Sequence, residues 1–300
     1  MENKDIQVIA APSILGLRPS GVELLADRLI ELGLMEELYC SLPLLRVKDL
    51  NERYSSQRDA NTACLNPEAI REFSVSLGSI VKNTVSKGDF ALVLGGDCSI
   101  LLGVMLGLRS LGRYGLVFID AHADFYAPHQ SVTGELADMD LGLVLGKGPE
   151  VLVNINDLEP YVLEEHVIHV GQRDQEETRE YGSDELRDTS VRCFDLELIR
   201  KKGMDAVSDQ VLSVVRGMEV SGLWLHLDLD VLDDAVNPAV EYRIAGGLSF
   251  SETEVLLAGL LATGKVAGMT VTVFNPALDK DGSIAIQIRD MICKAFQSVA

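Results

Sequence analysis

Two segments of the sequence end an apolar run in acidic residues, where a neutral turn would be more usual: GLVFIDAHAD and GLWLHLDLD. In extended backbone the side chains at i and i+2 point the same way, so Asp120, His122 and Asp124 share one side of the chain, as do Asp228 and Asp230. Carboxylates gathered in one partly buried site repel one another, and at least one takes up a proton unless a cation compensates them. The spacing therefore favours a divalent metal site. Each motif alone is equally compatible with a solvated turn or an exposed strand end.

A third apolar run, ALVLGGDCSI, leads into Asp97 and Cys98. An acid after two glycines commonly caps the next helix or braces the turn, so we expect Asp97 to support the ligands by hydrogen bonding. Cys98 is either a metal ligand or a small buried residue that binds nothing. As a ligand, its soft thiolate would shift the preference from manganese toward zinc or iron. His226 shares the i, i+2 face with Asp228 and is expected to support or join the ligands, the alternative being a core histidine.

Short continuous apolar runs alternate with helical patterns along the chain, which is typical of a parallel sheet covered by helices. The predicted strands span residues 7–11, 90–95, 115–120, 166–171, 191–195, 222–228 and 266–274. The predicted helices span residues 21–34, 67–86, 99–110, 205–218, 251–263 and 283–297, with Ser251 and Glu254 as a capping box on the fifth. Ligands of open parallel sheets collect beyond the carboxyl ends of the strands, which is where this pattern puts Asp97, Asp120 and Asp228.

The composition is that of one large α/β domain spanning residues 1–300, with 47% hydrophobic residues and no low-complexity linker. The formal net charge of −20 would repel phosphate backbones and anionic membrane surfaces, so neither nucleic acid nor membrane is an expected partner. The first residues lack the basic start and apolar stretch of a signal peptide, and no run has the length of a membrane span. Five cysteines without a CxxC pair describe no disulfide framework, so the expected location is cytoplasmic.

These motifs resemble those of the arginase, or ureohydrolase, superfamily. GGDCS, DAHAD and DLDVLD match its three signature motifs in order, and VGQRD, GGLSFSE and FNPALD are similar to three further stretches. The resemblance implies a three-layer α/β/α fold around an eight-stranded, mostly parallel sheet. It also implies two divalent metal ions, usually manganese, with Cys98 in the place of a histidine ligand. The first ion would lie with Cys98, Asp120, Asp124 and Asp228, and the second with His122, Asp230 and the shared Asp120 and Asp228.

Members of this superfamily hydrolyse carbon–nitrogen bonds other than peptide bonds, by attack of a metal-bridging hydroxide on a guanidinium carbon. By resemblance, Asp120 and Asp228 hold the two ions around that hydroxide, and Asp124 passes its proton to the leaving nitrogen. The resemblance thus implies a small-molecule substrate, and it is compatible with a homo-oligomer.

Two positions depart from the superfamily's pattern. Ala137 replaces a histidine that shuttles protons, and Val273 replaces a glutamate that pairs with the substrate guanidinium. A buried cation without an acceptor is severely penalised, so we expect a guanidino, hydroxyguanidino or amidino substrate other than L-arginine. The alternatives are a single-metal, deacetylase-like amide hydrolase and a metal-poor protein with a binding or regulatory role.

Six residues on the loops around the metals are expected to contact the substrate. Tyr126 and Tyr242 could donate to a developing oxyanion, and Arg243 could pair with a substrate carboxylate. The resemblance of the loops adds three more positions, which are Thr133, Glu135 and Glu176.

Overall fold

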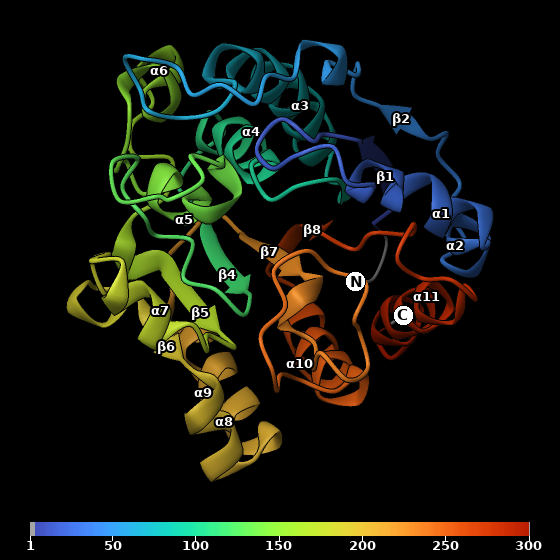
Figure 1. The fold of residues 1–300 in the computed structure, drawn as a ribbon. Helices are drawn as coiled ribbons and strands as arrows, with labels where there is room; N and C mark the ends of the chain where they lie inside the picture. Colours follow the sequence, from blue (N-terminus) through green and yellow to red (C-terminus); the bar gives the residue numbers. More distant parts are fainter. Residues whose placement is uncertain (1–3, 300) are drawn as a thin grey trace.

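A single sheet of eight parallel strands runs through the computed structural model, which describes residues 4–299 (Figure 1). The strand order is β2-β1-β3-β8-β7-β4-β5-β6. In chain order the strands are β1 (Ile6–Ala11), β2 (Leu45–Arg46), β3 (Phe90–Gly95), β4 (Gly115–Ile119), β5 (Val167–Val170), β6 (Arg192–Phe194), β7 (Leu223–Asp228) and β8 (Val266–Thr272). The eight-stranded, three-layer α/β/α architecture predicted from the sequence is confirmed.

Helices cover both faces of the sheet, so nearly every strand residue is buried and the strands read as continuous apolar runs. One face packs against α3 (Pro67–Ser86), α4 (Ile100–Arg109), α5 (Asp140–Val144) and α6 (Glu150–Val153). The other packs against α1 (Leu25–Glu31), α2 (Leu34–Glu37), α8 (Leu196–Lys202), α9 (Met204–Gly217), α10 (Phe250–Ala262) and α11 (Ser283–Gln297). A further short helix, α7 (Gln175–Glu180), follows β5. None of the helices between residues 4 and 299 is long and apolar enough to cross a membrane.

Two predicted helix features are wrong. The pattern at residues 21–34 is not one helix, because α1 ends at Glu31 and Gly33 takes a left-handed conformation (φ 83°) before α2 begins. The capping box of α10 is formed by Ser249 and Glu252, not by Ser251 and Glu254. The S-x-x-E spacing occurs twice in this segment, and the sequence pattern alone does not tell which serine precedes the first turn.

The strand ends also differ by one or two residues from the prediction. The strand predicted for residues 266–274 stops at Thr272, because Val273 leaves the extended conformation with φ 73°. The two-residue strand β2, which pairs with β1 at the edge of the sheet, was not predicted from the sequence since its run is too short to show a pattern.

The pairing of the strands brings the predicted ligand segments together. In the register of β4 and β7, Ile119 lies beside Leu227, so the residues that follow, Asp120 and Asp228, emerge next to each other. On the other side of β7, Asp228 lies beside Thr272 at the end of β8. The loop after β3, which carries Cys98, then closes over the same edge from beyond β8.

Candidate metal centre

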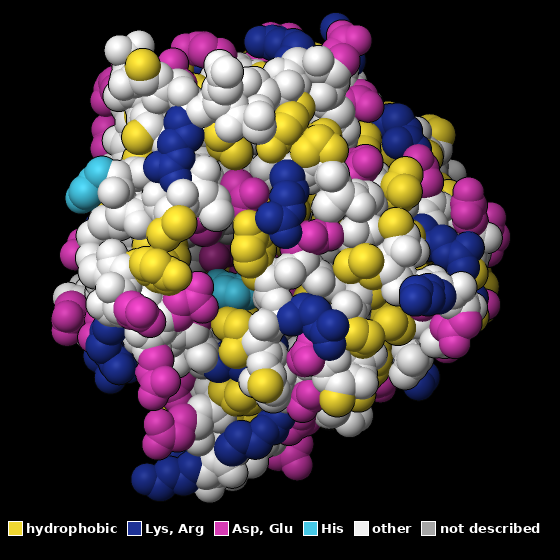
Figure 2. Space-filling model, in the orientation of Figure 1, with side chains coloured by type: hydrophobic (Ala, Val, Ile, Leu, Met, Phe, Trp, Pro, Cys, Tyr) yellow, Lys and Arg dark blue, Asp and Glu magenta, His cyan; other side chains and the backbone are white. Residues whose placement is uncertain are grey.

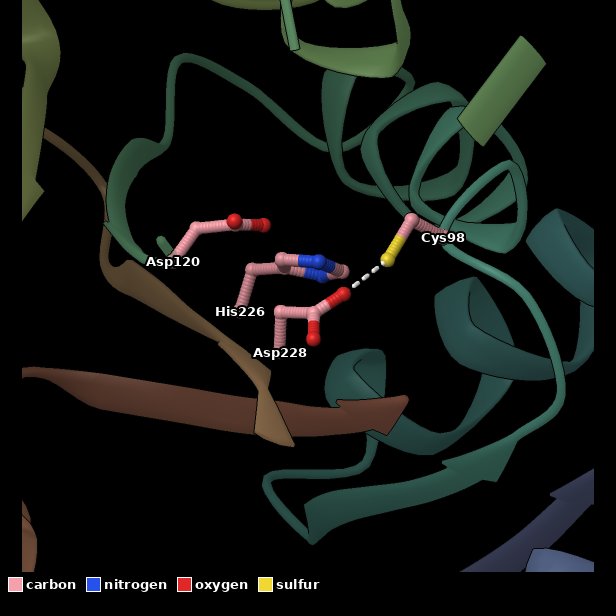
Figure 3. Close-up of side chains that lie close together, drawn as sticks. All are labelled: Cys98, Asp120, His226 and Asp228. Atoms are coloured by element: carbon pink, nitrogen blue, oxygen red, sulfur yellow. Dashed lines mark hydrogen bonds between the residues drawn. The ribbon is translucent and has the colours of Figure 1, made fainter. Parts of the chain in front are cut away.

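Four side chains of metal-binding type meet at the carboxyl edge of the sheet (Figure 3). Cys98, Asp120, His226 and Asp228 are all buried, and each offers one ligand atom within 4.8 Å of the other three. A second group shares Asp120 and adds His122 and Asp124, again within 4.8 Å of one another. The common carboxylate places the two groups side by side, which is the arrangement that a pair of bridged ions requires.

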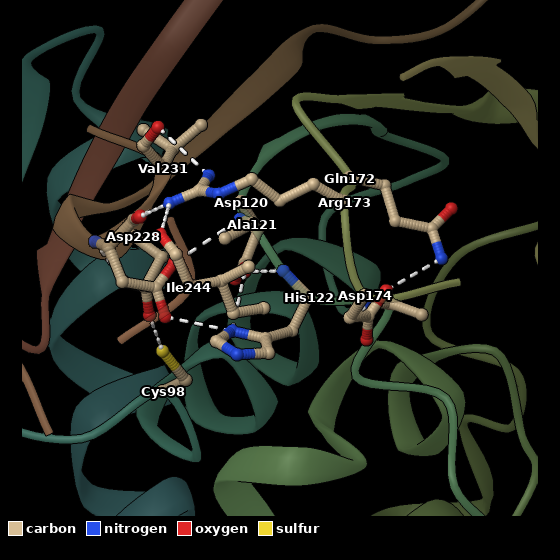
Figure 4. A network of polar contacts seen from close by, with 12 residues as sticks. Cys98, Asp120, Ala121, His122, Gln172, Arg173, Asp174, Asp228, Val231 and Ile244 are labelled. Carbon is tan, nitrogen blue, oxygen red and sulfur yellow. Dashed lines mark hydrogen bonds and ion pairs between the residues drawn. The ribbon is translucent and has the colours of Figure 1, made fainter. Parts of the chain in front are cut away.

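His122 lies between two carboxylates, as Figure 4 shows for its surroundings. Its Nδ1 is 2.9 Å from Asp230 Oδ2 and 3.6 Å from Asp120 Oδ1. The backbone holds the same two carboxylates, because the His122 N–H donates to Asp120 Oδ1 (2.7 Å) and the Ala121 N–H donates to Asp230 Oδ1 (3.2 Å). The other oxygen of Asp120 has no hydrogen-bond partner among residues 4–299.

Burial is the largest cause of the raised pKa values of the acids in this cluster. It raises the pKa of Asp120 to about 7, assisted by the neighbouring charge of Asp230, and it raises the pKa of Asp124 and Asp228 well above the usual range. The Cys98 thiol, which donates to Asp228 and lies 3.3 Å from Thr272 Oγ1, likewise has a raised pKa through burial and the charge of Asp228. Without cations the centre therefore holds protons that divalent ions would displace.

For His122 the charged form is favoured instead, because its pKa is raised by neighbouring carboxylates. Burial disfavours its protonated form, but Asp230 and Asp120 outweigh that penalty and raise its pKa well above its usual value. Burial would also raise the pKa of Asp230, yet His122 and Arg173 lower it overall. In the metal-free protein these two residues thus form a buried ion pair.

Three supporting residues were not singled out in the sequence. Arg173 donates to the carbonyl oxygens of Asp230 (2.7 Å) and Val231 (3.1 Å) and so fixes the turn after β7 (Figure 4). Asp174 accepts the Ala123 N–H at 3.0 Å, and His169 lies 2.7 Å from the His122 carbonyl. The VGQRD stretch was the available signal for the first two, since it directly follows a strand of the same sheet.

Asp140 is a further buried acid that sequence reasoning missed. It begins α5, one of its oxygens accepts the Leu141 N–H, and the other has no partner among residues 4–299. Burial and the charge of Asp120 raise its pKa well above the usual range. Its position in the loop sequence gives no periodic signal, which is why only the fold reveals that it faces the cluster.

Asp97 makes the hydrogen bonds of a residue that braces a turn. One of its oxygens accepts from Ser13 Oγ (2.9 Å) and Gly16 N (3.2 Å), and the other accepts from Ser99 N (2.9 Å). It is fully buried and ties the first loop of the chain to the turn that carries Cys98. Asp97 is therefore placed to position the turn that carries the cysteine.

A cavity of about 250 Å³ opens above the ligands. Its floor is formed by Cys98, His122, Asp124, Asp228 and Asp230. Its walls are largely apolar and aromatic and include Leu17, Tyr126, Val132, Tyr181, Tyr242 and Val273. In Figure 2 a hollow near the centre of the face shows a histidine and acidic side chains between hydrophobic ones. The size suits a small molecule that lies over these side chains.

The structure brings three of the six predicted substrate residues to this cavity and leaves three outside it. Tyr126, Thr133 and Tyr242 line the wall. Glu135 lies behind Tyr242 and accepts its hydroxyl at 2.5 Å. Arg243 is exposed and pairs with Asp234 instead of facing the cavity. Glu176 lines a separate surface cleft, and its neighbour Glu177 faces the metal cavity in its place.

Comparison with known proteins identifies the family to which this chain belongs. The sequence model of the arginase family matches residues 5–296. This chain belongs to the arginase family. It is 26% identical to the arginase of Staphylococcus aureus (strain MSSA476) over 308 aligned positions, which cover 98% of each chain. It is 29% identical to the arginase of Brevibacillus brevis over 298 positions, covering 94% of each. The crystal structure of arginase from Bacillus cereus shares 27% identity, with a TM-score of 0.85 over 98% of both chains.

Membership of the arginase family confirms the class of enzyme predicted from the sequence, a hydrolase of carbon–nitrogen bonds other than peptide bonds. Within this arginase-family chain, the two departures noted in the sequence both lie at the cavity. Ala137 and Val273 line it, so the residues that differ from the family pattern face the space where a substrate would bind.

Proposed function

We propose that this protein is a hydrolase with two divalent metal ions that cleaves a guanidino, hydroxyguanidino or amidino compound other than L-arginine. The observation that carries the proposal is the buried cluster of carboxylates, thiol and imidazole at the floor of a small cavity. The proposal treats residues 1–300 as one catalytic domain. It also favours a reducing, cytoplasmic setting, in keeping with five cysteines that are all unpaired.

The residues present fit a pair of divalent ions. Asp120 Oδ2 and both ring nitrogens of His226 are buried and have no hydrogen-bond partner within the described part of the chain. The proposed ligands are Cys98, Asp120, His122, Asp124, Asp228 and Asp230. Divalent ions in such a site lower the pKa of water and thereby supply a nucleophile at neutral pH. Manganese is the ion that the family suggests, while the thiol of Cys98 favours zinc or iron.

The chain's own residues would position the substrate and move the proton. Asp124 lines the cavity floor and is held in a left-handed backbone conformation (φ 46°) at the end of its motif. It is placed to accept a proton from the attacking water and to return it to the leaving nitrogen. Tyr126 on the wall stays protonated, since burial raises its pKa, and can donate to the oxygen that develops negative charge. The hydroxyl of Tyr242, the other tyrosine predicted for this role, already donates to Glu135.

The walls argue against L-arginine as the preferred substrate. Val273 offers no acceptor to a charged guanidinium, and Ala137 offers no base to its leaving group. A neutral hydroxyguanidine or an amidine makes less demand on a carboxylate, because less positive charge must be paired in the buried site.

A screen of metal-loaded protein tests this proposal. L-Arginine, hydroxyguanidino, guanidino, amidino and acetylamino compounds would be incubated with manganese- and zinc-loaded protein, and released urea, hydroxyurea, ammonia or acetate measured. We expect turnover of a hydroxyguanidino or amidino compound that exceeds turnover of L-arginine. Asp124→Asn is the control, and it should lose turnover while keeping the fold.

The outcomes separate the alternatives. Preferred turnover of L-arginine would contradict the substrate proposal and leave the hydrolase intact. Acetate release by protein with one ion per chain would support the deacetylase-like alternative. Absence of turnover together with absence of bound metal would support a binding role.

A further inference from the structure

His226 is a polar side chain in the buried interior of the sheet, between Phe118 and Thr270 in the strand register. It is fully buried on β7, and neither ring nitrogen has a hydrogen-bond partner among residues 4–299. The hydroxyl beside it in the sheet register, Thr270 Oγ1, already accepts from Trp224 Nε1 at 2.6 Å. Phe118 stacks against the ring at 4.8 Å and 16°. A buried imidazole left unpaired costs roughly 1–3 kcal/mol, so its presence calls for a partner that the protein chain does not supply.

The ring points toward the metal cluster. His226 and Asp228 lie on the same face of β7, and Figure 3 shows the imidazole extending beside the Asp228 carboxylate toward Cys98. A ring nitrogen lies within 4.8 Å of Cys98 Sγ and of oxygens of Asp120 and Asp228. The ligand atoms of a tetrahedral zinc ion lie about 3.3–3.8 Å apart, since its bonds measure about 2.0–2.3 Å. A single ion could therefore contact all four residues after side-chain shifts of up to about 1 Å.

We propose that His226 supplies a nitrogen ligand to the ion beside Cys98, so that this ion is held by one sulfur, one nitrogen and the oxygens of Asp120 and Asp228. The inference rests on the proposed function, because it assumes that the centre binds metal. The inference adds one nitrogen ligand, and it makes the set of ligand atoms around one ion different from the set around the other.

The two metal positions then differ in the ions that they select. The position at Cys98 and His226 has the mixed sulfur, nitrogen and oxygen set that favours zinc, iron(II) or cobalt(II). The neighbouring position, which His122 and Asp230 complete with the shared carboxylates, has only nitrogen and oxygen ligands and suits manganese. The protein would thus bind two unlike ions, with Asp120 shared between them.

The substitution His226→Phe tests the ligand directly, because it keeps a flat ring against Phe118 and removes both nitrogens. Metal-free protein would be titrated with cobalt(II), and the sulfur-to-cobalt absorption band and the affinity of that ion measured. We expect the affinity to fall by at least roughly tenfold, with manganese binding at the His122 position unchanged. His166→Phe is the control, since it replaces a histidine that precedes β5 and belongs to neither ligand group, and it should leave the cobalt band unchanged.

X-ray absorption on the unmodified protein gives a result that does not depend on a variant folding. With one equivalent of zinc or cobalt(II), we expect one sulfur and at least one imidazole on the same ion. Sulfur without imidazole, or unchanged cobalt binding by H226F, would overturn the role of His226 and leave the proposed hydrolase standing. Failure of the unmodified protein to bind any ion would instead overturn the proposed function itself.

Discussion

Cys98 is the residue that sets the chemical character of this centre. Its thiol lies against Asp228 within a group of buried donors, at a position where an imidazole would otherwise make the site one of nitrogen and oxygen ligands. Sulfur is softer than nitrogen and binds zinc, iron or cobalt in preference to manganese. We therefore expect this side chain to decide which metal the proposed centre prefers.

Replacement of Cys98 by histidine should reverse that choice. We predict that Cys98→His raises the affinity for manganese by roughly tenfold, equivalent to about 1.4 kcal/mol, and lowers the preference for zinc. Competitive dialysis with both ions measures the change. Cys98→Ala is the control, and unchanged metal content in that variant would show that the cysteine is not a ligand.

Val273 lines the cavity and offers no hydrogen-bond acceptor to a substrate guanidinium. We predict that Val273→Glu raises kcat/KM for L-arginine at least roughly tenfold, because the new carboxylate can accept the guanidinium N–H groups on the cavity wall. Val273→Gln has the same shape without the charge and should gain less. Equal gains, or none, would mean that pairing at this position does not limit the reaction.

Asp138 on the cavity wall should give the protein a measurable pH dependence. Burial raises its pKa to about 6, although Ser131 and Thr133 donate to it. Since the folded state holds this proton more tightly than the unfolded state, the stabilising effect is present below about pH 4 and is lost as pH rises through 6. We predict that Asp138→Asn matches the parent protein at pH 4 and is more stable by about 1–2 kcal/mol at pH 7, allowing for solvent in the cavity. Urea unfolding at both pH values measures the difference, and an equal difference at both would contradict the assignment.

At the scale of elements, the sequence predicted the strands and helices that have a repeated local pattern of apolar residues. The strand ends that carry Asp120 and Asp228 follow from apolar runs and were placed within a residue or two. The short helix α7 was not predicted, and its phase decides that Glu177 faces the cavity while Glu176 does not. Such a phase is set by packing against other elements, which a local pattern of six residues does not contain.

The capping box of α10 provides a test at this scale. Ser249 Oγ accepts the Glu252 N–H at 3.2 Å, and Glu252 accepts the Ser249 N–H at 2.8 Å. We predict that Ser249→Ala destabilises the protein by about 1 kcal/mol, whereas Ser251→Ala changes stability by less than about 0.5 kcal/mol. Urea unfolding of the two variants measures this, and a larger effect at Ser251 would restore the cap predicted from the sequence.

At the scale of the whole molecule, the acids proposed to bind metal are buried, and burying them lowers the stability of the metal-free fold. Four buried acids within one edge of the sheet, Asp120, Asp124, Asp140 and Asp228, have raised pKa values because burial and mutual repulsion disfavour their charges. The sequence could predict that such acids gather, since strand ends of a parallel sheet meet. It could not predict Asp140, whose position depends on how α5 closes over that edge.

We therefore predict that added metal reverses the order of stability of the parent protein and a variant that lacks one of these acids. Without metal, Asp120→Asn should be at least as stable as the parent protein, because it removes a buried carboxylate that must otherwise hold a proton. With each ion at one hundred times its dissociation constant, the parent protein should gain about 2.7 kcal/mol per site, and the variant much less. Urea unfolding with a chelator and with added metal measures both, and a variant that gains as much as the parent would exclude Asp120 as a ligand.

The measurement that tests the central claim most directly is the metal content of the purified protein after dialysis against manganese and zinc. The account predicts about two ions per chain, falling to at most about one in Asp120→Asn and to none in Asp120→Asn combined with Asp228→Asn. A parent protein that retains no ion, with its acids protonated around ordinary solvent, would contradict it.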